Sequence, residues 1–204
     1  GANANAFGRE SHIDVMAAKA GMDPVEFRLK NLTDARARGV LEAAARKFGW
    51  TPNAGPSGRG VGVAIGADAG AYVANMAEVK VDKATGRIQV VRVVCAQDCG
   101  TIIHPDGLEQ QIVGGMMQGL GYCLTEEVHF KNGEVTDRNF GTYQLPRFSW
   151  MPRLDAVMVK SDLPAQGGGE PSVVPMGAVL ANAVFDATGA RVRQLPMTPA
   201  RVLA

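Results

Sequence analysis

The run Ala71-Tyr-Val-Ala-Asn-Met-Ala-Glu-Val-Lys-Val81, together with Arg87-Ile-Gln-Val-Val-Arg-Val-Val-Cys-Ala96, decides the predicted fold. In the first run Val73, Val79 and Val81 share one phase of a period of two, and charged or polar residues occupy the other phase. The second run is rich in β-branched residues, and residues 82–86 between the two are typical of a hairpin turn. We therefore expect an antiparallel pair of strands here, which argues against a parallel doubly wound sheet.

The residues before this pair show helical periodicity. Residues 1–8 are small and polar and are predicted to form a loop, whereas residues 9–20 and 40–48 are predicted helices. A further helix is predicted to begin at Asp23-Pro24, with Asp23 as the N-cap, Pro24 at the first helical position and Glu26 completing a capping box. The Pro/Gly/Ser-rich stretch 51–58 marks a boundary, so we expect a helical segment at 1–50 and an α+β region at 59–204.

Further elements are predicted on both sides of the strand pair. A strand is expected at 60–65, a long helix at 107–124 and short strands at 142–147 and 156–160. Lys131-Asn132-Gly133 is typical of a type I′ hairpin turn, a helix is expected at 175–190, and another begins at Thr198-Pro199. Together these elements predict an α+β fold, with helices packed on an antiparallel or mixed sheet.

Composition excludes several classes of protein. The chain has 204 residues, 46% hydrophobic and 20% charged, with a net charge of +1, which is ordinary for a globular protein. It shows no basic stripe and few aromatic residues, so a nucleic-acid surface is not expected, and its apolar runs are too short for a membrane span. The cysteines and histidines lack the spacing of a disulfide framework or a metal site, and buried free thiols are expected for Cys95, Cys99 and Cys123.

The stretch Gln166-Gly-Gly-Gly-Glu-Pro171 holds the principal candidate for catalysis. Three consecutive glycines lose much backbone entropy on folding. Such a run is therefore expected where a ligand or another part of the chain must come very close to the backbone. Pro171 biases Glu170 toward an extended conformation just before the predicted helix. Two interpretations remain open from these residues alone: Glu170 caps that helix, or it acts as a general base beside a ligand.

The long helix carries an unusual face. Residues 111–121 include glycines at positions 114, 115, 119 and 121, although each costs roughly 1 kcal/mol relative to alanine in a helix. Gln111 and Gln118 lie on the same face, about 10 Å apart along the axis, with bare backbone between them. Such a face suits either a flat ligand rich in heteroatoms, bound by the two amides, or tight packing against another element.

Taken in order, these motifs resemble the molybdenum-binding subunit of the molybdenum hydroxylases, the xanthine dehydrogenase and aldehyde oxidase family, and in particular its isoquinoline and nicotinate oxidoreductase type. The resemblance covers the C-terminal part of that subunit and nearly all of this chain. It depends on the segments Arg9-Glu-Ser-His-Ile-Asp14, Gly21-Met-Asp-Pro-Val-Glu-Phe-Arg28, Asp98-Cys-Gly100, the helix at 111–121, Gly168-Gly-Glu-Pro171 and Ala181-Asn-Ala183.

The resemblance implies a site and a reaction. Glu170 would be the catalytic base, and Gln111, Gln118, Gly168 and Gly169 would lie beside a molybdenum–molybdopterin cofactor, often present as its cytosine dinucleotide form. The implied reaction hydroxylates an N-heterocycle or an aldehyde, with water as the source of oxygen. No residue of this chain is expected to ligate the metal.

The resemblance also implies partners. No iron–sulfur motif or flavin segment is present, so [2Fe–2S] clusters are expected on a partner chain or domain, with a flavin or cytochrome subunit as a further partner. The family's Gly-Gln-Gly cofactor loop is missing between the strands at 60–65 and 71–81, and the chain begins with Gly1. We therefore expect a piece of a larger subunit that is catalytically incomplete alone; the compartment stays open between cytoplasm and periplasm. The alternative is a non-catalytic assembly module of a multi-subunit complex.

Overall fold

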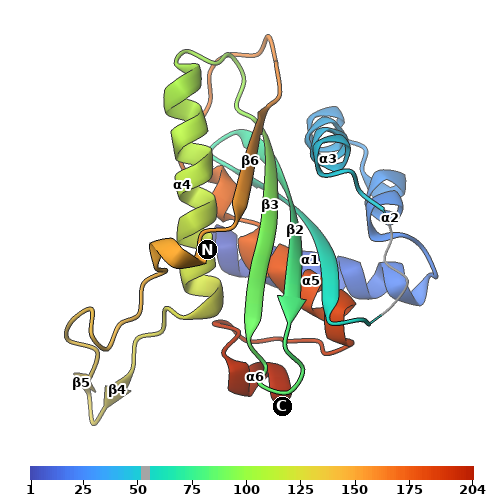
Figure 1. The fold of residues 1–204 in the computed structure, drawn as a ribbon. Coiled ribbons are helices and arrows are strands. Elements are labelled where there is room, and N and C mark those ends of the chain that lie inside the picture. The colour runs from blue at the N-terminus through green and yellow to red at the C-terminus, as the bar shows by residue number, and fades with distance from the viewer. Residues whose placement is uncertain (52–55) are drawn as a thin grey trace.

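The computed structural model describes residues 1–51 and 56–204, and its centre is a four-stranded mixed sheet with the strand order β1-β2-β3-β6 (Figure 1). The strands are β1 (Arg59–Asp68), β2 (Ala71–Val81), β3 (Ile88–Asp98) and β6 (Arg153–Met158). Strands β1, β2 and β3 pair antiparallel, and β6 pairs parallel with β3. The predicted α+β fold with a mixed sheet is therefore confirmed.

The predicted hairpin of β2 and β3 forms with Val79 opposite Val90 and Val81 opposite Ile88. The expected polar phase of β2 was wrong for much of the strand, because Ala74 and Met76 are fully buried there. A helix covers this face of the sheet as well, so both phases of the strand are apolar in its central part.

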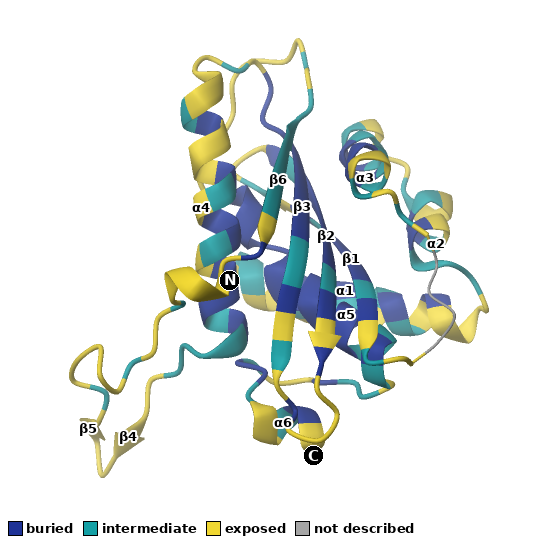
Figure 2. Cartoon of the chain, in the orientation of Figure 1, coloured by how far each residue is buried: buried dark blue, intermediate teal, exposed yellow. Residues whose placement is uncertain are grey.

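Helices lie on both faces of the sheet. They are α1 (Ala2–Lys19), α2 (Pro24–Asn31), α3 (Ala35–Phe48), α4 (Pro105–Leu124), α5 (Met176–Thr188) and α6 (Pro199–Leu203), with 3-10 turns η1 (Phe148–Trp150) and η2 (Pro171–Val173). Helices α4 and α5 pack with one face of the sheet in the main hydrophobic core, and α3 packs on the other face (Figures 1 and 2). Helix α1 runs along α5 and contacts β1.

Two predicted boundaries were wrong at the N-terminal side. Residues 2–8 are helical rather than a loop, because Ala6 is buried against Val173 and Val174 and extends the helix packing. Helix α3 begins at Ala35, earlier than expected, because the Asp34 carboxylate accepts hydrogen bonds from the N–H groups of Arg36 and Ala37. The predicted N-cap at Asp23 is confirmed, since its carboxylate accepts from the N–H groups two and three residues later.

The predicted boundary at 51–58 lies partly outside the described residues, because residues 52–55 are not among them. The division into segments 1–50 and 59–204 therefore stays a prediction. Within the described residues, α1 packs on α5 and α3 packs on β2 and β3, so the first 50 residues contact the sheet and its covering helix directly.

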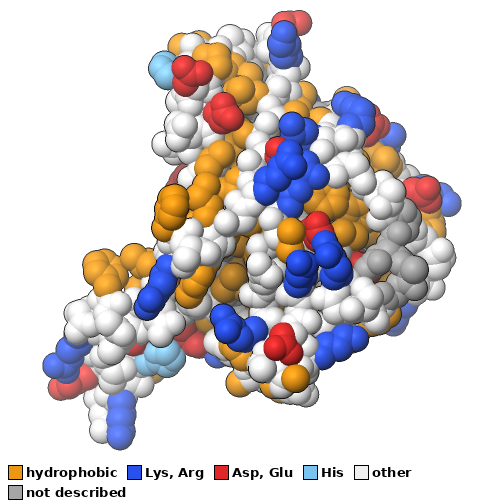
Figure 3. All heavy atoms as spheres, in the orientation of Figure 1, with side chains coloured by type: hydrophobic (Ala, Val, Ile, Leu, Met, Phe, Trp, Pro, Cys, Tyr) orange, Lys and Arg blue, Asp and Glu red, His pale blue; other side chains and the backbone are white. Residues whose placement is uncertain are grey.

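Residues 126–151 form an extended arm that leaves the body of the molecule (Figure 1). The predicted Asn132-Gly133 turn is confirmed: both residues have positive φ and join the short strands β4 (Phe130–Lys131) and β5 (Glu134–Val135). The predicted strand at 142–147 was wrong, since this part of the arm has no regular structure. Phe130, Phe140 and Phe148 are 76%, 78% and 89% exposed, and Figure 3 shows hydrophobic side chains on the arm's surface.

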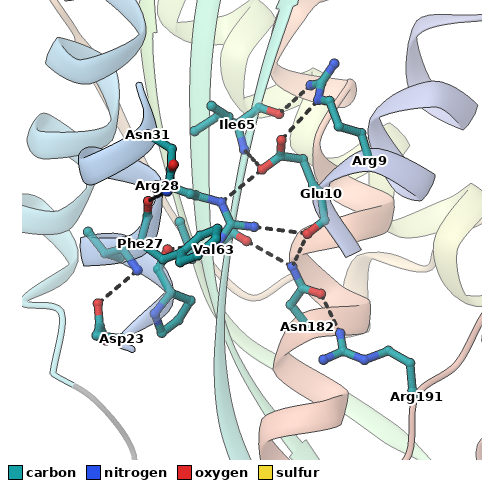
Figure 4. A network of polar contacts seen from close by, with 12 residues as sticks. Arg9, Glu10, Asp23, Phe27, Arg28, Asn31, Val63, Ile65, Asn182 and Arg191 are labelled. Carbon is teal, nitrogen blue, oxygen red and sulfur yellow. Dashed lines mark hydrogen bonds and ion pairs between the residues drawn. The ribbon is translucent and has the colours of Figure 1, made fainter. Parts of the chain in front are cut away.

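A buried polar network joins α1, α2, β1 and α5 (Figure 4). The carboxylate of Glu10, which is fully buried, accepts hydrogen bonds from Arg28 at 3.0 Å and from the Ile65 N–H at 3.1 Å. The Asn182 amide donates to the Val63 carbonyl at 3.1 Å and accepts from Arg191 at 2.8 Å. Several residues that carry the family resemblance thus have a structural role, because a buried charge is tolerated only when it is paired.

In the part of the chain that the structure describes, no helix combines the length and apolar character needed to cross a membrane.

Candidate functional site

The loops that follow β3 and β6 meet at the N-terminal end of α4 (Figure 1). They enclose an open hollow of about 270 Å³. Its lining comprises Cys99, Thr101, Ile102, Ile103, His104, Gly107, Leu108, Gln111, Ala165, Gln166, Gly168 and Gly169. Three of the predicted cofactor-binding residues, Gln111, Gly168 and Gly169, are therefore brought together here, although Gln111 lies more than 50 positions from the two glycines in sequence.

The Asp98-Cys99-Gly100 motif shapes one wall of this hollow. The carboxylate of Asp98 accepts hydrogen bonds from Arg36 at 2.8 Å and from the Gly100 N–H at 2.9 Å. Gly100 has φ of +73°, and a Cβ there would lie 2.1 Å from the Pro164 carbonyl oxygen. A side chain is excluded at this position both by the backbone conformation and by the close approach of the opposite loop.

Charge and burial perturb two groups in this motif. The Arg36 guanidinium holds the pKa of Asp98 below its ordinary value, so this carboxyl stays ionised at neutral pH. Burial raises the pKa of the neighbouring Cys99 thiol, and the charge of Asp98 acts in the same direction. The thiol that lines the hollow is therefore neutral, and Cys95 and Cys123 are likewise buried free thiols, as predicted.

The glycine-rich face of α4 divides into two halves. Gln111, Gly114 and Gln118 are exposed, and apart from the neighbouring backbone of α4 no described atom lies within 4 Å of the position that a Cβ would take at Gly114. A Cβ at Gly115, in contrast, would lie 2.1 Å from the Ser172 Oγ, and one at Gly119 would lie 2.4 Å from the Met176 side chain. Gly115 and Gly119 allow tight packing of α4 against η2 and α5, whereas the backbone at Gly114 is exposed and available to a ligand.

The exposed residues Gln111, Gly114 and Gln118 form an open strip on α4, and the glycine turn, residues 166–170, passes beside one end of it. Gly168 presents no side chain to the hollow, but its carbonyl accepts from the buried Gln97 amide at 3.0 Å. A Cβ at Gly169 would lie 3.6 Å from the Oε1 of Gln111, so the turn passes close to this side chain of α4. Glu170 follows directly, is exposed, and precedes η2. Its side chain makes no cap hydrogen bond within the described residues, which disfavours the interpretation of Glu170 as a helix cap.

The hollow does not enclose every predicted site residue. Its lining, as far as the chain is described, does not extend to Glu170 or to Gln118. Glu170 is next in sequence to the lining residue Gly169, and η2, which follows it, packs on α4 through Gly115. Gln118 lies two helical turns beyond Gln111 on the exposed strip. The combined surface runs from the hollow past Gly114 and is open to solvent.

Some residues of this region were missed at the sequence level. His104 caps α4, with its Nδ1 accepting from the Gly107 N–H at 2.7 Å. Gln97 is fully buried and holds the glycine turn. The only signal for Gln97 in the sequence was a polar residue directly after an apolar run, which is equally typical of a strand end.

A second hollow of about 380 Å³ lies between α1, α2 and α5. Its carboxylates have structural partners: Asp14 pairs with Arg191 at 2.8 Å, Asp186 accepts from the Val61 N–H at 2.8 Å, and Asp23 caps α2. Burial raises the pKa of Asp14 although Arg191 opposes the effect. These engaged groups make the second hollow a poor candidate for chemistry.

The chemistry available at the first hollow and the adjoining exposed face of α4 is that of amides and bare backbone, with the carboxylate of Glu170 next in sequence to the lining residue Gly169. Gln111 and Gln118 can donate and accept hydrogen bonds, and Gly114 and Gly169 permit a flat group to lie close. Within the described residues, no group of three or more His, Cys, Asp or Glu side chains is arranged to hold a metal ion. A metal at this site would therefore need ligands supplied by another group, such as the sulfur atoms of a pterin dithiolene.

Comparison with known proteins identifies relatives of this chain. The sequence model of the molybdopterin cofactor-binding domain matches residues 11–152. A subunit of nicotinate dehydrogenase from Pseudomonas putida is 39% identical over 220 residues, and the β subunit of isoquinoline 1-oxidoreductase from Brevundimonas diminuta is 34% identical over 197 residues. The solved structure of the aldehyde oxidoreductase from Desulfovibrio gigas superposes with a TM-score of 0.82 at 18% identity, a likeness of fold alone.

The chain is much shorter than these proteins. The alignments cover 98% and 95% of this chain but only 18% and 25% of the lengths of the Pseudomonas and Brevundimonas relatives. The superposition covers 100% of this chain and 40% of the aldehyde oxidoreductase. The matched domain and the two relatives show that this chain belongs to the molybdopterin cofactor-binding domain family, as part of the molybdenum-binding subunit of the molybdenum hydroxylases.

Proposed function

We propose that this chain contributes half of the active site of an oxidoreductase that hydroxylates an N-heterocycle or an aldehyde with oxygen from water. The observation that carries the proposal is the open strip on α4, where exposed Gln111, Gly114 and Gln118 adjoin the turn of Gly168, Gly169 and Glu170. Nicotinate dehydrogenase and isoquinoline oxidoreductase act on N-heterocycles, as their names state, which supports that substrate class.

The strip fits a molybdenum–molybdopterin cofactor. A pterin is flat and carries several nitrogen and oxygen atoms, and the amides of Gln111 and Gln118 can pair with such atoms as donors and as acceptors. Gly114 and Gly169 leave room for the ring system against bare backbone. When bound, the cofactor would supply the two-electron oxidation and hold the metal, for which this chain offers no ligand cluster among its described residues. The cytosine dinucleotide form remains part of the proposal.

Glu170 is the proposed general base. Its carboxylate is exposed and follows a turn that Gln97 ties to the sheet, and in the proposal an Oε atom accepts the proton released as oxygen is transferred. Gly168 and Gly169 keep side chains away from the approach to that carboxylate. Gln111 and Gln118 orient the cofactor.

The proposed partners complete the site. The remainder of the molybdenum subunit would supply further cofactor and substrate contacts, since the chain spans only 18% to 25% of its relatives. The exposed aromatic side chains on the arm at 126–151 are consistent with coverage by that remainder, because large apolar patches are rarely left in water. A [2Fe–2S] chain would receive the electrons, with a flavin or cytochrome subunit as the next acceptor.

Replacement of Glu170 by Gln in the complete enzyme tests this proposal. The turnover number should fall by about 10²- to 10⁴-fold, the usual contribution of general-base catalysis, because the amide cannot accept the proton. Molybdenum content and the melting temperature should not change, since the side chain is exposed. The matched control is Glu109→Gln, an exposed glutamate on α4, which should retain wild-type turnover. A Glu170→Gln enzyme that turns over at the wild-type rate would overturn the assignment.

The alternative function, a non-catalytic assembly module, is favoured by the packing role of Gly115 and Gly119 and by the exposed arm. It predicts full activity for the Glu170→Gln enzyme and no dependence of molybdenum content on the α4 strip. The same experiment therefore separates the two functions.

A further inference from the structure

Two buried amide side chains lie beneath the turn that carries Glu170. Asn75 on β2 and Gln97 on β3 are both fully buried and are on the sheet face that packs against α4 and α5. The Gln97 Nε2 donates to the Gly168 carbonyl at 3.0 Å, and the Asn75 Nδ2 donates to the Ser172 carbonyl at 2.9 Å. The two acceptor carbonyls belong to the residues two positions before and two positions after Glu170.

These amides are costly residues for a hydrophobic core. The Asn75 Oδ1 and the Gln97 Oε1 have no hydrogen-bond partner among the described residues. A buried polar atom without a partner has lost its hydrogen bonds to water, and this destabilises the folded state. An apolar side chain of similar volume would avoid that cost, but it would leave the Gly168 or Ser172 carbonyl without this donor. The two amides are therefore explained by the need to hold these two carbonyls in place.

The rest of the turn is anchored at the same time. The Gln166 N–H donates to the Cys99 carbonyl at 2.8 Å, and the Gly167 N–H donates to the Ala69 carbonyl at 3.0 Å. On the other side the Tyr122 hydroxyl donates to the Val173 carbonyl at 3.0 Å. Pro171 and Ser172 are buried whereas Glu170 is exposed, so the chain enters the core immediately after the carboxylate. The three glycines make the backbone of this segment conformationally flexible, and these hydrogen bonds restrict that flexibility.

We infer that Asn75 and Gln97 are positioning residues that fix the direction of the Glu170 carboxylate relative to the α4 strip. The inference rests on the proposed function, in which Glu170 is the base. Both amides act on backbone carbonyls rather than on the reacting atoms, so their effect passes through the geometry of the turn. A displacement of a catalytic group by about 1 Å can cost about 10²-fold in rate. Loss of either amide donor should therefore lower kcat more than it weakens the binding of substrate.

The test uses the complete, molybdenum-loaded enzyme with Gln97→Met or Asn75→Leu, which are close in volume to the native side chains and lack donors. Each variant should lower kcat by about 10- to 100-fold while KM and molybdenum content stay within about twofold. Hydrogen exchange should become faster at the N–H groups of Gln166, Gly167 and Val173, which anchor the turn through the carbonyls of Cys99, Ala69 and Glu170. This last measurement does not depend on activity.

The matched control is Asn182→Leu, which removes a buried amide that donates to the Val63 carbonyl in a different part of the core. It should lower the melting temperature but leave kcat and the exchange of residues 166–173 unchanged. A loss of stability alone therefore cannot produce the expected result.

A second variant keeps the inference testable if an apolar replacement does not fold. Gln97→Glu retains a donor only while the buried carboxyl is protonated, and burial raises the pKa of a carboxyl. The kcat of this variant relative to that of the wild type should therefore fall as the pH rises. A ratio that is independent of pH would overturn the inference for Gln97.

The remaining outcomes are distinct from failure of the proposed function. Unchanged exchange at 166–173 in the Gln97→Met and Asn75→Leu enzymes would overturn the inference. Faster exchange with unchanged kcat in these two variants would also overturn the inference. In that case the proposed function would still stand, provided that the Glu170→Gln enzyme is inactive. An active Glu170→Gln enzyme would contradict the proposed function, and with it the role of the two amides.

Discussion

At the scale of single residues, Asp98 shows how the end of β3 is fixed beside the hollow. Its side chain is 6% exposed, pairs with Arg36 at 2.8 Å, and accepts the Gly100 N–H. One carboxylate therefore ties α3 to the loop that lines the hollow. The sequence presents Asp98-Cys99-Gly100 only as a strand break, because the partner, Arg36, lies 62 positions away.

Asp98→Asn should show a pH-dependent loss of stability. The folded-state pKa of Asp98 lies below the ordinary value, so its contribution is present above that ordinary value, about 3.9. It is lost as the pH falls through the lower folded-state pKa. At pH 7 the variant should lose about 1.5–3 kcal/mol, the usual magnitude for hydrogen bonds to a charged group. Urea unfolding at pH 7 and at pH 3 measures this, and an equal difference at both values would contradict the prediction.

At the scale of elements, the buried network places α1 and α2 against β1 and α5 (Figure 4). Glu10 and Arg28 are 0% and 1% exposed, so each charge depends on the other. Glu10→Gln should destabilise the protein by about 3–5 kcal/mol, because it leaves the Arg28 charge buried without its counter-charge. Equilibrium urea unfolding measures the loss.

The matched control is Glu134→Gln, which breaks the Glu134–Arg138 pair on the arm, where both side chains are more than 70% exposed. That change should cost less than about 1 kcal/mol, as exposed ion pairs usually do. Similar losses in the two variants would show that the buried pair contributes no more than a surface pair.

Helix α4 allows packing and binding to be separated. Gly114→Ala should stabilise the protein by up to about 1 kcal/mol, because alanine is the better helix former and nothing described lies near the new methyl group. The same change should lower the molybdenum content if the cofactor lies on the strip, and Gly114→Leu should lower it further. Thermal unfolding and metal analysis of the complete enzyme measure the two effects.

Gly39→Ala in α3 provides the control for this pair of effects. Gly39 is also in a helix, and apart from the neighbouring backbone of α3 no described atom lies within 4 Å of the place where its Cβ would be, so the gain in stability should be similar. Its molybdenum content should equal that of the wild type. Full molybdenum content in Gly114→Leu would place the cofactor elsewhere.

At the scale of the whole molecule, local patterns predicted more than long-range pairings. The β2–β3 hairpin, the Asn132-Gly133 turn and the apolar α5 depend on neighbouring residues, and all three were predicted. The parallel pairing of β6 with β3 depends on contacts more than 60 positions apart and was not predicted. The helical start at Ala2 was missed because the contacts of Ala6 with residues 173 and 174 stabilise a segment without strong helical periodicity.

The candidate site was predictable in part for the same reason. Glycine composition alone indicated a special face on α4 and a special turn at 166–171. It did not indicate that Gly115 and Gly119 pack against η2 and α5 while Gly114 stays open, because that division depends on tertiary contacts. The supporting amides of Asn75 and Gln97 were also missed, since their partners lie 97 and 71 positions away.

The most direct measurement is a crystal structure of the complete, molybdenum-loaded subunit. We expect the pterin over Gly114 between Gln111 and Gln118, and the Glu170 carboxylate within hydrogen-bond reach, about 2.6–3.2 Å, of an atom bound to molybdenum. A cofactor on another face of the molecule, with Glu170 directed into solvent, would contradict this account.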